Sequence, residues 1–111
     1  MRDKIETFIG FSIKSRKAVY GLDSVIRYRK KMHCFLICKT VSENTEKEVL
    51  KLAQKYDLPL IKTVEKTLSE ITFLDNCKVL ALTNKELSKA VLDNLNSGYM
   101  LVNRIKSTDA D

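Results

Sequence analysis

Two short runs of almost wholly apolar residues indicate the architecture of this chain. Residues 33–38 read HCFLIC, and residues 79–82 read VLAL. Runs of this length without polar alternation are typical of strands that are buried on both faces of a sheet. Such strands need helices above and below them, so we expect a sheet with helices on both faces.

Segments with helical spacing of apolar residues alternate with these strands. Ser42 is a suitable N-cap for one helix, and residues 83–86, TNKE, have the form of a capping box for another. Gly21 and Pro59 interrupt the chain between elements. The sequence therefore predicts an α/β sandwich. The expected helices cover 2–13, 22–31, 43–56, 68–71 and 84–95, and the expected strands cover 17–20, 33–38, 60–61 and 79–82.

The length and composition of the chain agree with a single domain. Its 111 residues are 44% hydrophobic and 31% charged, which suffices to fill one core and excludes a disordered or fibrous chain. We expect one domain over residues 1–98 and a tail over residues 99–111. The tail begins with the apolar residues 99–102, which have no clear period. Two interpretations stay open, in which this run either packs on the domain or meets a partner.

The sequence predicts neither a membrane segment nor a disulfide framework. No apolar stretch approaches the roughly 20 residues that a membrane helix needs. The chain opens with charged residues at positions 2, 3 and 4 rather than with a secretory signal. Three cysteines cannot all pair within one chain, as fits a reducing compartment. We therefore expect a soluble, cytoplasmic protein.

The positive charge of the chain lies in its first third. The net charge is +6, and residues 1–40 alone hold ten basic and three acidic side chains, a net of +7. A local excess of this kind favours a polyanionic partner, because Lys and Arg release the counterions of phosphates when they bind. The alternative is a set of basic side chains that only face water.

The segment 14–31, KSRKAVYGLDSVIRYRKK, combines a glycine turn with a basic flank. Gly21 lets a backbone approach a ligand closely, and the helix after it offers unpaired N–H groups to phosphate. In a second interpretation Asp23 is only the helix N-cap, and the basic residues are its solvated face. The candidate RNA-binding residues are Lys14, Arg16 and Lys17 for phosphate contacts, Gly21 for close approach, Asp23 and Ser24 for a base edge, and Arg27 with Lys31, one helical turn later, as a positive wall.

Two tyrosines in the same basic third could stack on nucleic-acid bases, since an aromatic face accepts any base. Tyr20 ends a strand and is expected in the core. Tyr28 faces away from the apolar side of its helix and is the better stacking candidate.

Several segments together resemble a known family. They are FIGFSIKSRKAVYGLDSVIRYRKK at 8–31, SENTEKEV at 42–49, DLPLIKT at 57–63 and VLALTNKELSKAV at 79–91. In this order they are similar to the kink-turn RNA-binding ribosomal protein superfamily (L-seven-Ae and L-thirty-e), and most closely to its short bacterial YlxQ-like branch. The resemblance covers about residues 5–95. It implies a three-layer α/β/α sandwich with a four-stranded mixed sheet, no cofactor and no catalysis.

The resemblance also implies where RNA would bind. In kink-turn binders an Asn-Glu pair follows the glycine turn, with a Lys three residues later, and here Gly21 is kept while Asp23, Ser24 and Arg27 stand at those positions. An ionised Asp only accepts hydrogen bonds, whereas Asn also donates them. A second family contact is a loop before the last strand, where Leu74 of Leu74-Asp75-Asn76-Cys77 keeps the apolar residue that packs on an extruded base.

Residues that could support other chemistry are few. Cys34 and Cys38 would lie about 13 Å apart along a strand, too far to share a zinc ion, so buried inert thiols are expected. His33 heads a strand and lacks an evident acid or nucleophile as a catalytic partner, so it is expected to be structural or solvated. We see no catalytic motif and expect neither enzyme, metal nor small-molecule substrate.

Two functional hypotheses follow from these features of the sequence. The first is a non-enzymatic RNA-binding protein, associated with rRNA or the ribosome, whose partners are structured RNA and a ribosomal or translation-associated protein. The second is a protein-interaction module on the same fold, which uses residues 99–102 and the Leu74 loop. Only RNA binding should weaken steeply with salt.

Overall fold

The computed structural model describes residues 3–103, in which five helices and five strands alternate. None of the helices in this range is long and apolar enough to cross a membrane. The helices are α1 (Lys4–Lys14), α2 (Leu22–Arg27), α3 (Glu43–Tyr56), α4 (Leu68–Thr72) and α5 (Lys85–Asp93). The strands are β1 (Ala18–Tyr20), β2 (Cys34–Ile37), β3 (Leu60–Thr63), β4 (Val79–Leu82) and β5 (Tyr99–Leu101).

The strands form one mixed sheet in the order β1-β4-β2-β3-β5. Strand β2 pairs in parallel with β3, and the other three pairings are antiparallel. The two fully buried strands, β2 and β4, lie inside the sheet, as their unbroken apolar sequences predict. The α/β fold class is confirmed.

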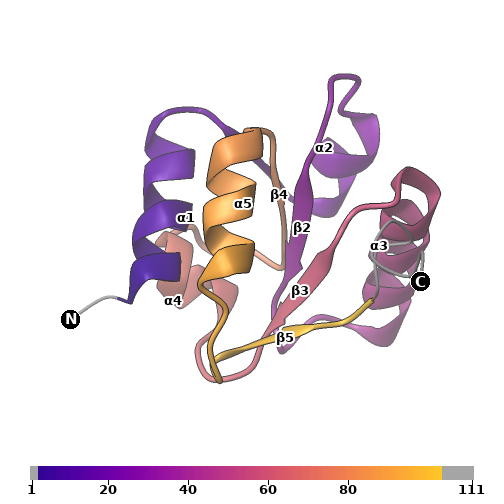
Figure 1. Ribbon diagram of the computed structural model, residues 1–111. Helices are drawn as coiled ribbons and strands as arrows, with labels where there is room; N and C mark the ends of the chain where they lie inside the picture. Colours follow the sequence, from indigo (N-terminus) through magenta and orange to yellow (C-terminus); the bar gives the residue numbers. More distant parts are fainter. Residues whose placement is uncertain (1–2, 104–111) are drawn as a thin grey trace, which may run out of the picture.

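Helices cover both faces of this sheet, and the sheet divides the core into two clusters (Figure 1). The first cluster lies under α1, α4 and α5 and includes Ile5, Leu68 and Val91. The second lies under α2 and α3 and includes Val25 and Val49. Burial of apolar area in both layers stabilises the fold by roughly 25 cal/mol per Å².

Successive residues of β2 point alternately into the two clusters. Cys34 and Leu36 belong to the first cluster, whereas Phe35 and Ile37 belong to the second. All four side chains are fully buried. This alternation explains why the strand has no polar face, because each of its sides packs against helices.

The sheet has five strands, so the expectation of four is wrong. The additional strand, β5, runs antiparallel to β3, with Tyr99 opposite Thr63. The chain then stays attached to the sheet edge, because the Val102 N–H donates to the Leu60 carbonyl at 2.8 Å and the Asn103 side chain bonds the backbone of Leu58 and Leu60. Residues 99–102 therefore pack on the domain, and residues 104–111 of the expected tail lie outside the described residues.

Helix α2 is shorter than expected. The sequence predicts a helix that continues to Lys31, but α2 ends at Arg27, and Tyr28 has an extended backbone. Met32 is buried in the second cluster and Tyr28 packs against the same cluster, so the chain leaves the helix to bring both side chains to the sheet. The prediction that Lys31 lies one helical turn after Arg27 is therefore wrong.

Side-chain caps begin α3 and α5 close to the predicted positions, whereas α2 has no side-chain cap: its N-cap is Gly21, so the interpretation of Asp23 as the N-cap is wrong. The Ser42 hydroxyl accepts a hydrogen bond from the Thr45 N–H at 3.2 Å, as predicted for α3. For α5 the cap is Asn84, which accepts from the Leu87 N–H at 2.8 Å. That helix ends at Asp93, earlier than its apolar pattern predicts. Each such cap stabilises its helix by about 1 kcal/mol.

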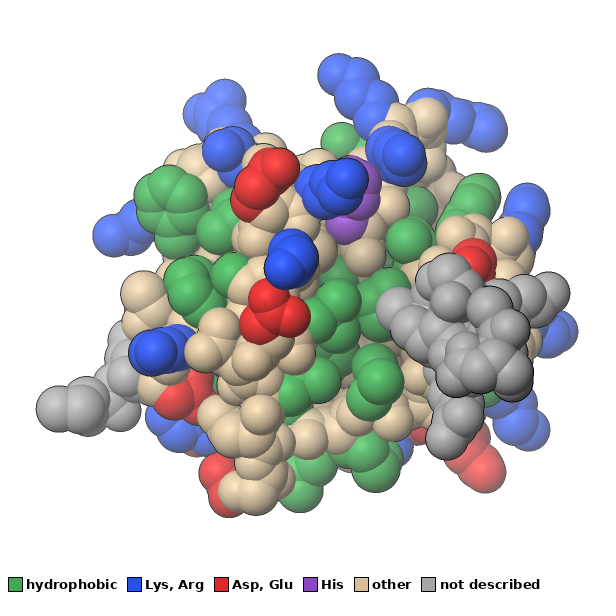
Figure 2. All heavy atoms as spheres, viewed as in Figure 1, with side chains coloured by type: hydrophobic (Ala, Val, Ile, Leu, Met, Phe, Trp, Pro, Cys, Tyr) green, Lys and Arg blue, Asp and Glu red, His purple; other side chains and the backbone are tan. Residues whose placement is uncertain are grey.

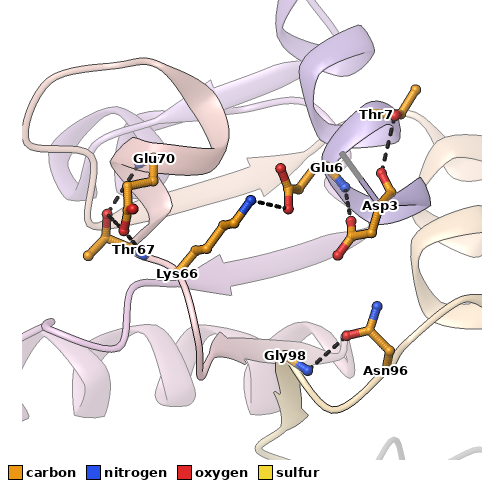
Figure 3. A network of polar contacts seen from close by, with 8 residues as sticks. All are labelled: Asp3, Glu6, Thr7, Lys66, Thr67, Glu70, Asn96 and Gly98. Carbon is orange, nitrogen blue, oxygen red and sulfur yellow. Dashed lines mark hydrogen bonds and ion pairs between the residues drawn. The ribbon is translucent and has the colours of Figure 1, made fainter. Parts of the chain in front are cut away.

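A polar network ties α1 to the loop before α4 (Figure 3). The residue Glu6 is only 5% exposed, and the Lys66 ammonium donates to its carboxylate at 2.9 Å. This hydrogen bond raises the pKa of Lys66. Asp3 caps α1 beside it, and Thr67 and Glu70 form a capping box that starts α4. The ion pair between Lys66 and Glu6 holds the first turn of α1 beside the start of α4, in the same layer.

Candidate nucleic-acid interface

The candidate RNA-binding residues fall at the two opposite ends of strand β1. The Gly21 N–H donates to the Val79 carbonyl at 2.9 Å, which places the glycine turn at the start of β4. The Thr83 N–H donates to the Lys17 carbonyl at 2.9 Å, which places residues 14–17 at the end of β4. Because a strand rises by about 3.3 Å per residue, Lys17 and Gly21 lie roughly 13 Å apart. The structure therefore divides the predicted site into two parts.

The first part is the glycine-turn end, which we define as Gly21, Asp23, Ser24 and the loop 73–77. Asp23 and Ser24 are exposed in the first turn of α2. Leu74 is half-buried and packs against the first cluster, whereas α2 covers the second. Leu74 and the start of α2 thus lie at the same end of the sheet but in different layers. Because α2 has only six residues, its dipole adds little to the attraction of an anion to its N-terminus. The negative charge of Asp23 in the first turn repels an anion there.

Gly21 has a backbone that only glycine adopts readily, with φ at 90° and ψ at 138°. We expect Gly21→Ala to lower the free energy of unfolding by about 1–3 kcal/mol, because a Cβ is strained at this positive φ. Urea unfolding measures this loss. Ser24→Ala, an exposed substitution three residues later, is the control and should change stability by less than about 0.5 kcal/mol. Equal stability of Gly21→Ala and the unchanged chain would contradict the backbone argument.

The second part is the basic end, which we define as residues 14–17 and 29–31 together with Lys85. The Lys17 carbonyl and the His33 N–H bond to Thr83 and Leu82, two consecutive residues at the end of β4. The strands on either side of β4 are about 10 Å apart, at 4.8 Å per spacing. Segments 14–17 and 29–31 therefore lie at the same end of the sheet, on either side of β4. Figure 2 shows Lys and Arg side chains gathered along the top of the molecule, above the ends of α1 and α2.

The segment 14–31 accounts for the charge of the whole chain. It holds seven basic side chains and one acidic one, a net of +6, which equals the net charge of the protein. All seven are exposed except Lys17, which is half-buried. Within residues 3–103, no ion pair engages any of them. The ion pairs found there are Lys62–Glu46, Lys66–Glu6 and Lys89–Asp93. This uncompensated charge is a surface suited to a polyanion.

His33 responds to the positive potential at the basic end. Its pKa lies below the ordinary value of 6.5, mainly because partial burial disfavours the charged ring, and then because Lys31 and Lys85 repel a further positive charge. Glu86 acts in the opposite direction. The ring is therefore mostly neutral at pH 7, and the charge of the basic end comes chiefly from Lys and Arg.

One exposed aromatic residue is not among the predicted site residues, and two tyrosines lie in other environments than predicted. Phe73, in the loop before β4, is 78% exposed, with positive φ at 61°. Tyr20 is 50% exposed, so the expectation that it lies in the core is wrong. Tyr28 is half-buried beyond the end of α2. The only signal for Phe73 in the sequence is its place as an aromatic residue in a loop. Whether such a side chain is exposed depends on contacts with segments that are distant in the sequence.

The cysteines are buried thiols. Cys34, Cys38 and Cys77 are all free and almost fully buried. Within the described part of the chain, no group of three His, Cys, Asp or Glu side chains could hold a metal ion. Burial raises the pKa of Cys34 to about 12 and also raises that of Cys77. Burial acts in the same direction on Cys38, but hydrogen bonds with Thr40 and the Leu68 N–H outweigh it and lower the pKa.

The high pKa of Cys34 predicts a loss of stability in alkaline solution. The thiol keeps its proton in the folded state up to about pH 12, whereas the unfolded chain releases it near its ordinary value of 9.0. The titration of Cys34 therefore leaves the free energy of unfolding unchanged below about pH 9. That free energy falls as the pH rises from 9.0 towards the folded-state pKa of about 12. We expect about 1 kcal/mol of this loss between pH 8 and pH 10.

Urea unfolding of the chain and of Cys34→Ala at both pH values isolates this effect. The variant should be less stable at pH 8, because it leaves a small cavity, but its stability should fall less between the two pH values. Parallel decreases in both proteins would contradict a buried, protonated Cys34.

Comparisons with known proteins bear on the fold only. No family model matches the sequence, and a search of curated proteins gives no match. Among solved structures, a protein of unknown function from Bacillus halodurans is similar, with a TM-score of 0.75 and 14% sequence identity. The similarity covers 83% of this chain and 96% of that one. The fold therefore occurs in another protein at low sequence identity.

Proposed function

We propose that this protein is a non-enzymatic RNA-binding protein that contacts structured RNA through its basic end. The observation that carries the proposal is the set of seven basic side chains in 14–31, six of them at the basic end, which lack ion-pair partners among the described residues; together with Asp23 they give a net charge of +6, equal to that of the chain. Lys and Arg bind phosphates with release of counterions, so such a surface gains most from a polyanion. The proposal assigns no catalytic residue and no cofactor.

The two segments of the basic end would contact the phosphate backbone of the RNA. Lys14, Arg16 and Lys17 approach from one side of β4, and residues 29–31 from the other. Arg27 ends α2 between them and the glycine-turn end. An RNA that reached both ends would follow β1 and α2 for roughly 13 Å. Phosphate contacts fix the orientation of a protein on its nucleic acid, and contacts at base edges specify the sequence.

The finer part of the proposal is association with rRNA or the ribosome in the cytoplasm, which rests on the resemblance to kink-turn binders. The glycine-turn end would then supply the contacts to bases. Gly21 allows close approach, Ser24 both donates and accepts hydrogen bonds, and Asp23 accepts only. Leu74 is half-buried against the first cluster, on the opposite face of the sheet from α2. An RNA at the start of α2 would therefore have to extend past the edge of the sheet to place an extruded base against Leu74.

Binding to three RNAs at two salt concentrations tests the proposal. The RNAs are a kink-turn, an unkinked duplex and total rRNA, each with the chain, with Arg27→Ala and with the control Lys51→Ala. Lys51 is an exposed lysine of α3, so the control matches the loss of charge. A kink-turn preference that Arg27→Ala alone removes would support the family's recognition mode. Salt-sensitive binding without that preference would support the basic end only, and failure to bind any of the three would overturn the proposal.

A protein-interaction module is the second candidate, and one observation favours it. Phe11 and Phe73 are 55% and 78% exposed and line a groove of about 540 Å³ beside α1 and the end of α4. Exposed aromatic side chains are enriched at protein interfaces. A partner bound there would respond weakly to salt and would be lost in Phe11→Ser, whereas RNA binding would be unchanged in that variant, because Phe11 lies in neither part of the proposed RNA interface.

A further inference from the structure

A pocket beside the basic end has the composition of a nucleotide site. It has a volume of about 380 Å³ and lies between the loop that follows α2 and the end of α3. Its apolar lining includes Met32, which is 93% buried, and the half-buried Leu58. Ligand pockets in proteins measure about 300–1,000 Å³, so this one has room for a single small ligand or one unit of a chain.

Two tyrosines line the pocket from separate elements. Tyr28 comes from the loop after α2 and is half-buried against the second cluster, which fixes its ring. Tyr56 is the last residue of α3 and is 49% exposed. The ammonium of Lys55 lies 5.4 Å from the centre of the Tyr56 ring. Aromatic side chains of this kind stack on bases of any sequence.

Three consecutive cations complete the lining. Arg29, Lys30 and Lys31 are exposed, and no ion pair within residues 3–103 engages them. Asp57 is the acidic residue between Tyr56 and Leu58 in the sequence, but it is not part of the lining. The pocket therefore combines aromatic side chains with positively charged ones, which together complement a base joined to a phosphate.

We propose that this pocket binds one nucleotide unit, with the base against Tyr28 and Tyr56 and the phosphate against Arg29, Lys30 and Lys31. The unit comes either from an RNA strand or from a free mononucleotide, since both present the same groups. The first source rests on the proposed RNA-binding function, and the second does not. In either case the site lies away from the glycine turn and Leu74.

Titration with adenosine 5′-monophosphate, followed by amide chemical shifts, tests the pocket without any RNA. We expect shifts confined to residues 26–32 and 55–58. Adenosine and ribose 5-phosphate, which each lack one of the two groups, should bind more weakly. Tyr56→Ala should weaken binding about fivefold, as expected for the loss of one stacking side chain. The control is Tyr20→Ala, since Tyr20 is 50% exposed but lies on β1 outside the pocket, and it should bind as the unchanged chain does.

The outcomes separate this inference from the RNA proposal. Shifts at the pocket together with Tyr56-dependent binding of an RNA strand would identify an RNA unit as the ligand. Shifts at the pocket without RNA binding would identify a free nucleotide and leave the pocket in place while the RNA proposal fails. The pocket inference is overturned if the mononucleotide gives no shifts at the pocket up to about 10 mM, or if Tyr20→Ala and Tyr56→Ala weaken binding equally.

Discussion

Replacement of Lys14, Arg16 and Lys17 by Gln should weaken RNA binding about 100-fold at 0.1 M salt, because each lost phosphate contact forfeits its counterion release. These residues form one of the two segments of the basic end. They lie outside the nucleotide pocket, so the triple variant tests the phosphate contacts alone. The measurement is the dissociation constant of a fluorescently labelled kink-turn RNA, with total rRNA as competitor.

The matched control for this variant removes the same charge elsewhere. Lys4, Lys47 and Lys51 are exposed lysines of α1 and α3, and their replacement by Gln also lowers the net charge by three. We expect the control to weaken RNA binding less than about threefold, through the general potential only. If the two triple variants bind equally weakly, net charge rather than the basic end determines binding, and the proposed interface is wrong.

Phe35→Ala should have the largest effect on stability, a loss of about 3–5 kcal/mol. Phe35 is fully buried at the middle of the sheet, where β2 pairs it with Leu60 on one side and Ala81 on the other. Truncation removes apolar burial and leaves a cavity that neighbouring strands cannot fill. The free energy of unfolding of a typical domain is only about 5–15 kcal/mol. The urea concentration at the midpoint of unfolding should therefore be much lower for the variant than for the unchanged chain.

Phe11→Ala is the control for Phe35→Ala, because it removes the same atoms from a side chain that is 55% exposed. It should change the free energy of unfolding by less than about 0.5 kcal/mol, and Ala is a better helix former than Phe. Similar losses in both variants would mean that β2 does not lie between two packed layers.

The central strands and the sandwich could be predicted from the sequence, whereas the sheet edge could not. The apolar runs 33–38 and 79–82 demand burial on both faces, which is a local property. Strand β5 has three residues, of which Met100 and Leu101 are 49% and 44% exposed, so its only buried side chain is Tyr99. One buried residue gives no period, and the strand exists because Thr63 and its neighbours offer an edge to pair with.

The candidate site was predictable in its charge and not in its geometry. The excess of Lys and Arg in 14–31 is visible in the sequence because the residues are neighbours there. The separation of the candidate RNA-binding residues into two ends depends on the antiparallel pairing of β1 with β4, a contact between segments about 60 residues apart. The end of α2 likewise depends on Met32, which packs in a core built by distant strands and by α3. Such contacts override local helix patterns.

The salt dependence of binding to the kink-turn RNA tests the central claim most directly. If the basic end contacts about five phosphates, the logarithm of the association constant should fall with the logarithm of salt concentration with a slope of roughly −4 to −5. The Lys14, Arg16 and Lys17 variant should reduce the magnitude of this slope by about 2–3, while the Lys4, Lys47 and Lys51 control leaves it unchanged. A slope shallower than about −1, or one that the first variant does not change, would contradict RNA binding through the basic end.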